Sequence, residues 1–138
     1  MPFRSGPASW SSAARRGSSS GGAPPPVGRL GEDAVAREYE RRGARVVGRN
    51  VRTPEGEIDL VVRDGAALVA VEVKTRTGAG AGWPAEAVTS RQLARVGRAL
   101  ERLAAGALRA APRRIDVAEV LVAAGAVVEI RIHQDVTS

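Results

Sequence analysis

The sequence contains no cysteine, one histidine, two tryptophans, one tyrosine and one phenylalanine. Without cysteine there is no disulfide, thiolate zinc site, iron–sulfur cluster or cysteine nucleophile. A single histidine, His133, excludes a metal site built on a histidine pair. So few aromatics argue against a protein that binds single strands mainly by stacking bases on rings. No apolar run approaches the about 18 residues of a membrane-spanning helix. We expect a cytoplasmic protein without a membrane partner, because a cysteine-free chain is compatible with a reducing compartment.

Lysine is almost absent as well. The chain has 21 basic and 15 acidic residues, a net charge of +6, and every basic residue except Lys74 is arginine. Residues 1–27 hold three of the arginines and no acid, so half of the excess positive charge lies in this segment. The remaining 28–138 are only mildly basic. Net charge alone therefore says little about nucleic-acid binding.

Residues 1–27 are rich in serine, glycine, proline and alanine. Such a composition buries too little apolar surface to offset the entropy of ordering, so we predict a disordered tail. A twin arginine is present, but no apolar segment of an export signal follows it. An organelle transit peptide is the alternative interpretation of this arginine- and serine-rich segment.

Residues 28–138 have the length of one domain. Hydrophobic periodicity and turn residues predict a mixed α/β domain in the order α-β-β-β-α-β-β. The predicted helices cover 29–42 and 89–108. The predicted strands cover 45–52, 57–62, 67–75, 115–122 and 127–133.

The second and third strands form a predicted hairpin, because Asp64-Gly65 between apolar runs is a strong signal for a two-residue turn. Counting outward from that turn places Glu57 opposite Glu72, with Asp59 as a diagonal neighbour of Glu72. Strand alternation then sorts the hairpin into two faces. The predicted apolar face comprises Ile58, Leu60, Val62, Val69, Val71 and Val73.

The opposite face gathers Glu57, Asp59, Glu72 and Lys74. Like charges opposite each other destabilise a sheet, so we expect a bound cation here. Hard oxygen ligands favour Mg²⁺ or Mn²⁺ over zinc. The alternative is a solvated outer face with an incidental Glu–Lys pair. The one lysine weighs against that alternative, because an ammonium is a compact charge with an adjustable pKa, unlike a guanidinium.

Two motifs in the hairpin also carry a family resemblance. Gly56-Glu57-Ile58-Asp59-Leu60, followed by Glu72-Val73-Lys74-Thr75-Arg76, resembles the GEIDL and EVKTR motifs of the YraN-like family of endonuclease-like proteins. That family belongs to the restriction-endonuclease-like superfamily, whose signature is PD-(D/E)xK. The similarity covers about residues 28–120. Ile58 departs from the superfamily proline, and Arg91 stands where the family commonly has lysine.

The resemblance implies a restriction-endonuclease-like mixed β-sheet flanked by helices, with a metal-dependent nuclease site at the hairpin. Asp59 and Glu72 would ligate the metal, with Glu57 as an acidic neighbour, and Lys74 would orient or activate the attacking water. Glu32 matches a helix glutamate that points into the site of related Holliday-junction resolvases.

Four arginines, Arg91, Arg95, Arg98 and Arg102, step by four, three and four along the second helix and share one face. This face is either a phosphate-tracking surface or a solvated helix face. We count these four, with Arg76 of the EVKTR motif, as candidate nucleic-acid contacts.

The sequence therefore favours an endonuclease that uses Mg²⁺ or Mn²⁺ to cut DNA, including branched or otherwise structured DNA. A dimer would suit an enzyme that cuts two strands. One alternative is a nucleic-acid-binding protein that keeps the fold without useful cleavage, and another is an adaptor domain.

Overall fold

The helices and strands follow the predicted order. The computed structural model describes residues 27–77 and 88–136. The elements are α2 (Val27–Arg41), β1 (Arg45–Thr53), β2 (Gly56–Asp64), β3 (Ala67–Thr77), α3 (Ser90–Leu103), a short 3₁₀ helix (Gly106–Leu108), β4 (Arg113–Ala123) and β5 (Ala126–His133).

Local sequence signals begin and end the helices. Gly43 adopts a φ of 96°, which favours glycine, and it follows the last turn of α2. Thr89 caps α3, since its side chain accepts from the backbone N–H of Gln92 while the Gln92 side chain accepts in return from the Thr89 N–H. The predicted second helix was too long at its end. It stops at Leu103, and Gly106, with a φ of 76°, opens the separate 3₁₀ turn.

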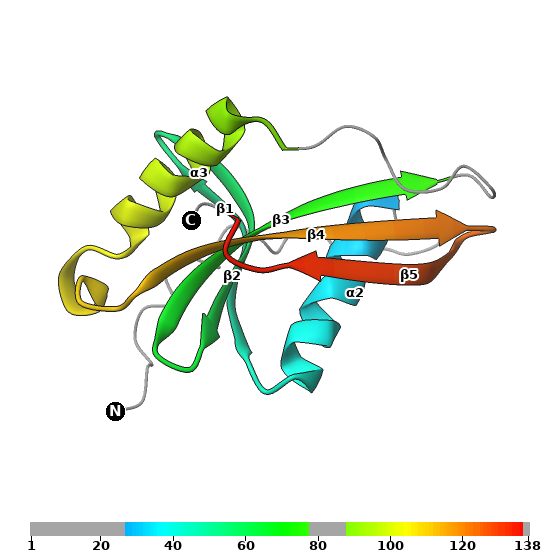
Figure 1. The fold of residues 1–138 in the computed structure, drawn as a ribbon, viewed down its shortest axis with the longest axis horizontal. Coiled ribbons are helices and arrows are strands. Elements are labelled where there is room, and N and C mark those ends of the chain that lie inside the picture. The colour runs from blue at the N-terminus through cyan, green and yellow to red at the C-terminus, as the bar shows by residue number, and fades with distance from the viewer. Residues whose placement is uncertain (1–26, 78–87, 137–138) are drawn as a thin grey trace, which may run out of the picture.

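The five strands form one mixed sheet in the order β1-β2-β3-β4-β5 (Figure 1). All neighbours are antiparallel except β3 and β4, which are parallel and joined through α3. This is the predicted α/β architecture.

The predicted hairpin register was wrong by two residues. Asp64 pairs with Ala67 and Leu60 pairs with Val71, so the turn is Gly65-Ala66 rather than Asp64-Gly65. Gly65 takes a φ of 60° in the first turn position. Because the error is two residues, the register shift by itself moves no side chain to the other face of the sheet.

Helices cover both faces of the sheet (Figure 1). Leu60, Val62, Val69 and Val71 pack with α2, as the predicted apolar face requires, and Val73 borders the same cluster. Ile58 was assigned to this face wrongly. It packs with Val51, Val61 and α3 on the other side, because the alternation of side chains is interrupted between Ile58 and Leu60. The interruption falls at Asp59.

A buried ionic network ties α2 to the sheet. Asp116 is fully buried on β4 and accepts hydrogen bonds from the Tyr39 hydroxyl at 2.6 Å and from Arg114 Nε at 2.9 Å. Arg114 also pairs with Asp64. Arg114 therefore links the buried Asp116 to Asp64.

The predicted disordered tail, residues 1–27, lies outside the described residues, apart from Val27 in α2. In the part of the chain that the structure describes, no helix is long and apolar enough to cross a membrane.

Candidate functional site

The candidate site lies where the sheet forks. Pairing between β2 and β3 ends at Leu60 and Val71, whereas β2 continues to pair with β1 as far as Gly56. β3 pairs with β4 from Leu68 to Thr77, so beyond Val71 it keeps β4 as a partner after its pairing with β2 has ended. Asp59 therefore lies on one branch of the fork, and Glu72 and Lys74 lie on the other.

The Asp59 side chain replaces one of the backbone hydrogen bonds that are absent between β2 and β3 in the fork. Its Oδ2 accepts a hydrogen bond from the backbone N–H of Val73 at 2.8 Å. Burial raises the pKa of Asp59, while the Val73 N–H, Glu72 and Lys74 lower it. The side chain is thus held inside the fork by the backbone of the opposite branch.

Glu72 shares its environment with Asp59. Burial raises the pKa of Glu72, and the charge of the neighbouring Asp59 and a side-chain interaction with it raise this pKa further, to about 8. The Glu72 Oε1 atom is buried and has no hydrogen-bond partner. An unsatisfied buried oxygen beside a second carboxylate favours the binding of a cation.

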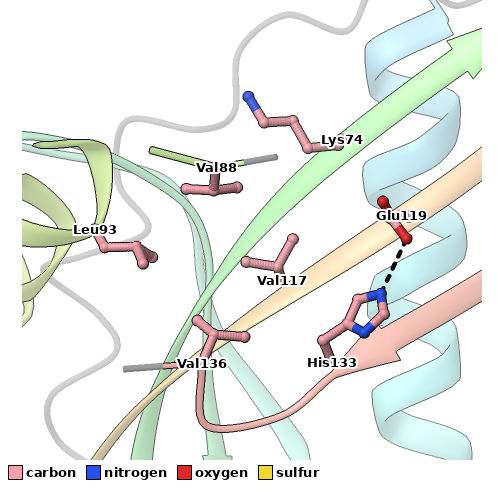
Figure 2. Close-up of a pocket in the computed structure, with 7 residues that line it drawn as sticks. All are labelled: Lys74, Val88, Leu93, Val117, Glu119, His133 and Val136. Carbon is pink, nitrogen blue, oxygen red and sulfur yellow. Dashed lines mark hydrogen bonds and ion pairs between the residues drawn. The ribbon is translucent and has the colours of Figure 1, made fainter. Parts of the chain in front are cut away.

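Lys74 is the positive charge of this group. Its ammonium lowers the pKa of both Asp59 and Glu72. The side chain is half-buried, and Figure 2 shows its ammonium directed away from the Glu119–His133 pair.

Glu32 reaches the group from α2. The helix approaches β3 so closely at Gly31 that a Cβ at this position would overlap the Thr75 hydroxyl. Asn50, held at a φ of 48°, donates to Glu32 Oε1 at 3.3 Å. Burial, followed by the charges of Asp59 and Glu57, raises the pKa of Glu32 to about 7. This predicted site residue is therefore electrostatically coupled to the hairpin.

Glu57 is exposed and lines a polar cavity of about 210 Å³ with Glu72, Gln92, Arg95 and Val96. The charge of Arg95 lowers the pKa of Glu72. One member of the predicted arginine face therefore lies at the acidic cluster itself.

The carboxylates form an open arrangement. Within residues 27–77 and 88–136, no three His, Asp or Glu side chains meet as a complete metal-binding cluster. Mg²⁺ usually keeps several waters and takes one or two protein carboxylates with substrate phosphate. Asp59 and Glu72, with the unpartnered Oε1 of Glu72, fit that requirement.

The other candidate arginines differ in their surroundings. Arg91 and Arg98 are exposed on α3, whereas Arg102 donates to both carboxylate oxygens of Glu55 at 2.7 Å. Arg76 is half-buried on β3, opposite Leu121 of β4. The arginine face is thus partly neutralised at Arg102.

The sequence did not predict two ion pairs near the candidate site, one beside Glu32 on α2 and one on the strands β4 and β5 next to Lys74. Asp33 pairs with Arg49 beside Glu32, and Glu119 pairs with His133 across β4 and β5. Arg49 and Asn50 are 16 and 18 residues away in the sequence from the α2 residues that they contact, so no local pattern links them. The parallel pairing of β3 with β4, which brings Glu119 beside Lys74, left no local signal.

The fold and the acidic hairpin define a restriction-endonuclease-like α/β protein. A family model described as "Uncharacterised protein family UPF0102" matches residues 31–120, and the chain belongs to this family. It is the YraN family that the hairpin motifs resemble.

Individual relatives agree with this assignment. A UPF0102 protein of Beutenbergia cavernae is 50% identical over 96 residues, which cover 69% of this chain and 81% of the relative. One from Symbiobacterium thermophilum is 47% identical over 95 residues, covering 68% and 80%. One from Frankia casuarinae is 51% identical over 76 residues, covering 55% and 64%.

Proposed function

We propose that this UPF0102 protein is a metal-dependent endonuclease that hydrolyses phosphodiester bonds in DNA. The observation that carries the proposal is the pair of carboxyls in the fork: Asp59 is fixed by the Val73 N–H, and Glu72 presents a buried oxygen without a partner. Mg²⁺ or Mn²⁺ held by these two residues would polarise a phosphate oxygen and lower the pKa of a bound water.

The protein's own groups supply the remaining requirements. Lys74, beside both carboxylates, would orient the attacking water and stabilise negative charge that develops on the phosphate. Glu32, whose pKa of about 7 lies near neutral pH, is suited to accept a proton from that water. Arg95, at the rim of the Glu57–Glu72 cavity, would contact a neighbouring phosphate.

The test is cleavage of labelled duplex, flap and four-way-junction DNA with Mg²⁺, with Mn²⁺ and with EDTA. We expect products only with metal, and none from Asp59→Asn or Lys74→Met. Glu40→Gln, an exposed change on α2, is the matched control and should cut like the wild type.

Two outcomes would overturn the proposal: no cleavage of any substrate by the wild type, or undiminished cleavage by Asp59→Asn. Salt-sensitive DNA binding without metal-dependent products would favour the alternative of a nucleic-acid-binding protein with a nuclease-like fold.

A further inference from the structure

A second cavity, of about 290 Å³, adjoins the candidate site at Lys74 (Figure 2). Its volume is close to the lower end of the range for small-molecule pockets. Lys74 lies at the fork and also lines this cavity, so a ligand that occupied both places would contact the Lys74 side chain. The other lining residues come from α3, from β4 and β5, and from the segments beside them.

Sheet register fixes how far the cavity lies from the carboxyl pair. On β4, Val117 is directly beside Glu72 and Glu119 is directly beside Lys74. His133 of β5 lies opposite Val117 on the far side. With about 4.8 Å between neighbouring strands, the polar end of the cavity is one to two strand spacings from Glu72, one of the two proposed metal ligands.

The lining is divided between apolar and polar groups. Four aliphatic side chains, Val88, Leu93, Val117 and Val136, supply most of the wall. At the β4–β5 side, Glu119 Oε1 lies 2.9 Å from His133 Nε2. This bond positions the carboxylate and leaves its second oxygen directed away from the imidazole (Figure 2). The cavity thus combines apolar walls with one fixed acceptor.

We propose that this cavity binds an unpaired nucleobase next to the scissile phosphate, and that Glu119 selects bases with an exocyclic amino group over thymine. The position of the scissile phosphate rests on the proposed function. An unpaired base costs least to move out of the stack, so the cavity would favour bulged or branched DNA. A carboxylate accepts from the amino group of cytosine, whereas thymine presents a carbonyl oxygen there.

The proposal is tested by binding in EDTA, which needs no cleavage. The probes are fluorescein-labelled duplexes with one unpaired cytosine, one unpaired thymine, or no unpaired base, and the readout is fluorescence anisotropy. We expect the wild type to bind the cytosine bulge about tenfold more tightly than the thymine bulge, which corresponds to about 1.4 kcal/mol.

Three variants separate the cavity from general DNA binding. Glu119→Gln, whose amide also donates, should abolish the preference for cytosine over thymine. Glu129→Gln makes the same charge change on exposed β5 outside the cavity and should keep the preference. Val88→Phe should reduce binding of both bulges to the level of the perfect duplex, because it fills the cavity from a residue outside the main core clusters.

Equal wild-type affinity for the two bulges, no binding of bulged DNA, or an unchanged preference in Glu119→Gln would each overturn the proposal. Metal-dependent cleavage without a base preference would overturn the proposal that the cavity binds a base and would leave the proposed nuclease function standing. A protein that shows the preference but yields no metal-dependent product refutes the nuclease and keeps the cavity.

Discussion

The carboxylate of Asp59 accepts a hydrogen bond from the backbone N–H of Val73, 2.8 Å away, just beyond the last paired residues of β2 and β3. A side chain thus replaces one rung of the backbone ladder. The same carboxylate raises the pKa of Glu72 and of Glu32. One residue therefore joins the two branches of the fork and sets the charge of the candidate site.

Two substitutions at Asp59 separate these roles. Asp59→Asn keeps an oxygen that accepts from Val73 and removes the repelling charge, so without metal it should be at least as stable as the wild type. Asp59→Ala leaves the Val73 N–H unpaired and should be less stable than Asp59→Asn by about 1–3 kcal/mol. Urea denaturation with and without Mn²⁺ measures both. Equal stability of the two variants would contradict the structural role, and Mn²⁺ should stabilise only the wild type.

Stability without metal should fall as pH rises. The pKa of Glu32 is about 7 in the folded protein against an ordinary value of 4.5, so folding takes up protons between these values. The folded state is therefore favoured fully below pH 4.5 and loses that contribution as pH rises through 7. Glu32→Gln keeps the Asn50 contact and should reduce this fall in melting temperature, leaving the part that the raised pKa of Glu72 contributes, whereas Glu40→Gln should follow the wild type. A parallel fall in Glu32→Gln would contradict the assignment.

Two glycines of α2 should respond oppositely to alanine. A Cβ on Gly31 would overlap the Thr75 hydroxyl, so Gly31→Ala should cost about 1–3 kcal/mol by overpacking. A Cβ on Gly28 would meet no other part of the fold within 4 Å, and Gly28→Ala should be neutral or stabilising by up to about 1 kcal/mol. Thermal unfolding compares them. Adding Thr75→Ser to Gly31→Ala should not restore stability, since the overlapping hydroxyl remains. Adding Thr75→Ala should restore much of the lost stability.

The buried Asp116 network predicts a purely structural effect. Tyr39→Phe removes the 2.6 Å hydrogen bond to Asp116 and should lower the free energy of unfolding by about 1.5–3 kcal/mol. Asp116→Ala leaves Arg114 without its main partner and should cost about 3–5 kcal/mol. Urea denaturation measures both. Metal-dependent activity of folded Tyr39→Phe should match the wild type, and a large loss of it would place this network in the site instead.

Much of the fold was predictable because its signals are local. Glycine at the end of α2, alternation in the strands and the leucine spacing of α3 depend on near neighbours in the sequence. The grouping of Asp59, Glu72 and Lys74 was also predictable, because a shift of two residues in register preserves the side of each strand.

The remaining features depend on distant parts of the chain. Asp64-Gly65 and Gly65-Ala66 are both two-residue turns, and the pairing of Leu60 with Val71 decides between them. Ile58 lies on the opposite face from Leu60, and Asp59, which lies between them, bonds to the backbone of the opposite branch. Likewise, Glu119 lies opposite Lys74 on the neighbouring strand only through the parallel pairing of β3 and β4.

The arginines of α3 should contribute unequally if the face contacts DNA. Each phosphate contact adds about 0.9 to the slope of log affinity against log salt for duplex DNA. Arg91→Ala and Arg98→Ala remove exposed charges and should each reduce the slope by about that amount. Arg102→Ala should change it little, because the guanidinium already donates to both oxygens of Glu55. Glu55→Gln should weaken that pair and steepen the slope. Salt titrations of DNA binding measure all four, and equal losses from the three arginine variants would show that Glu55 does not compete with DNA for Arg102.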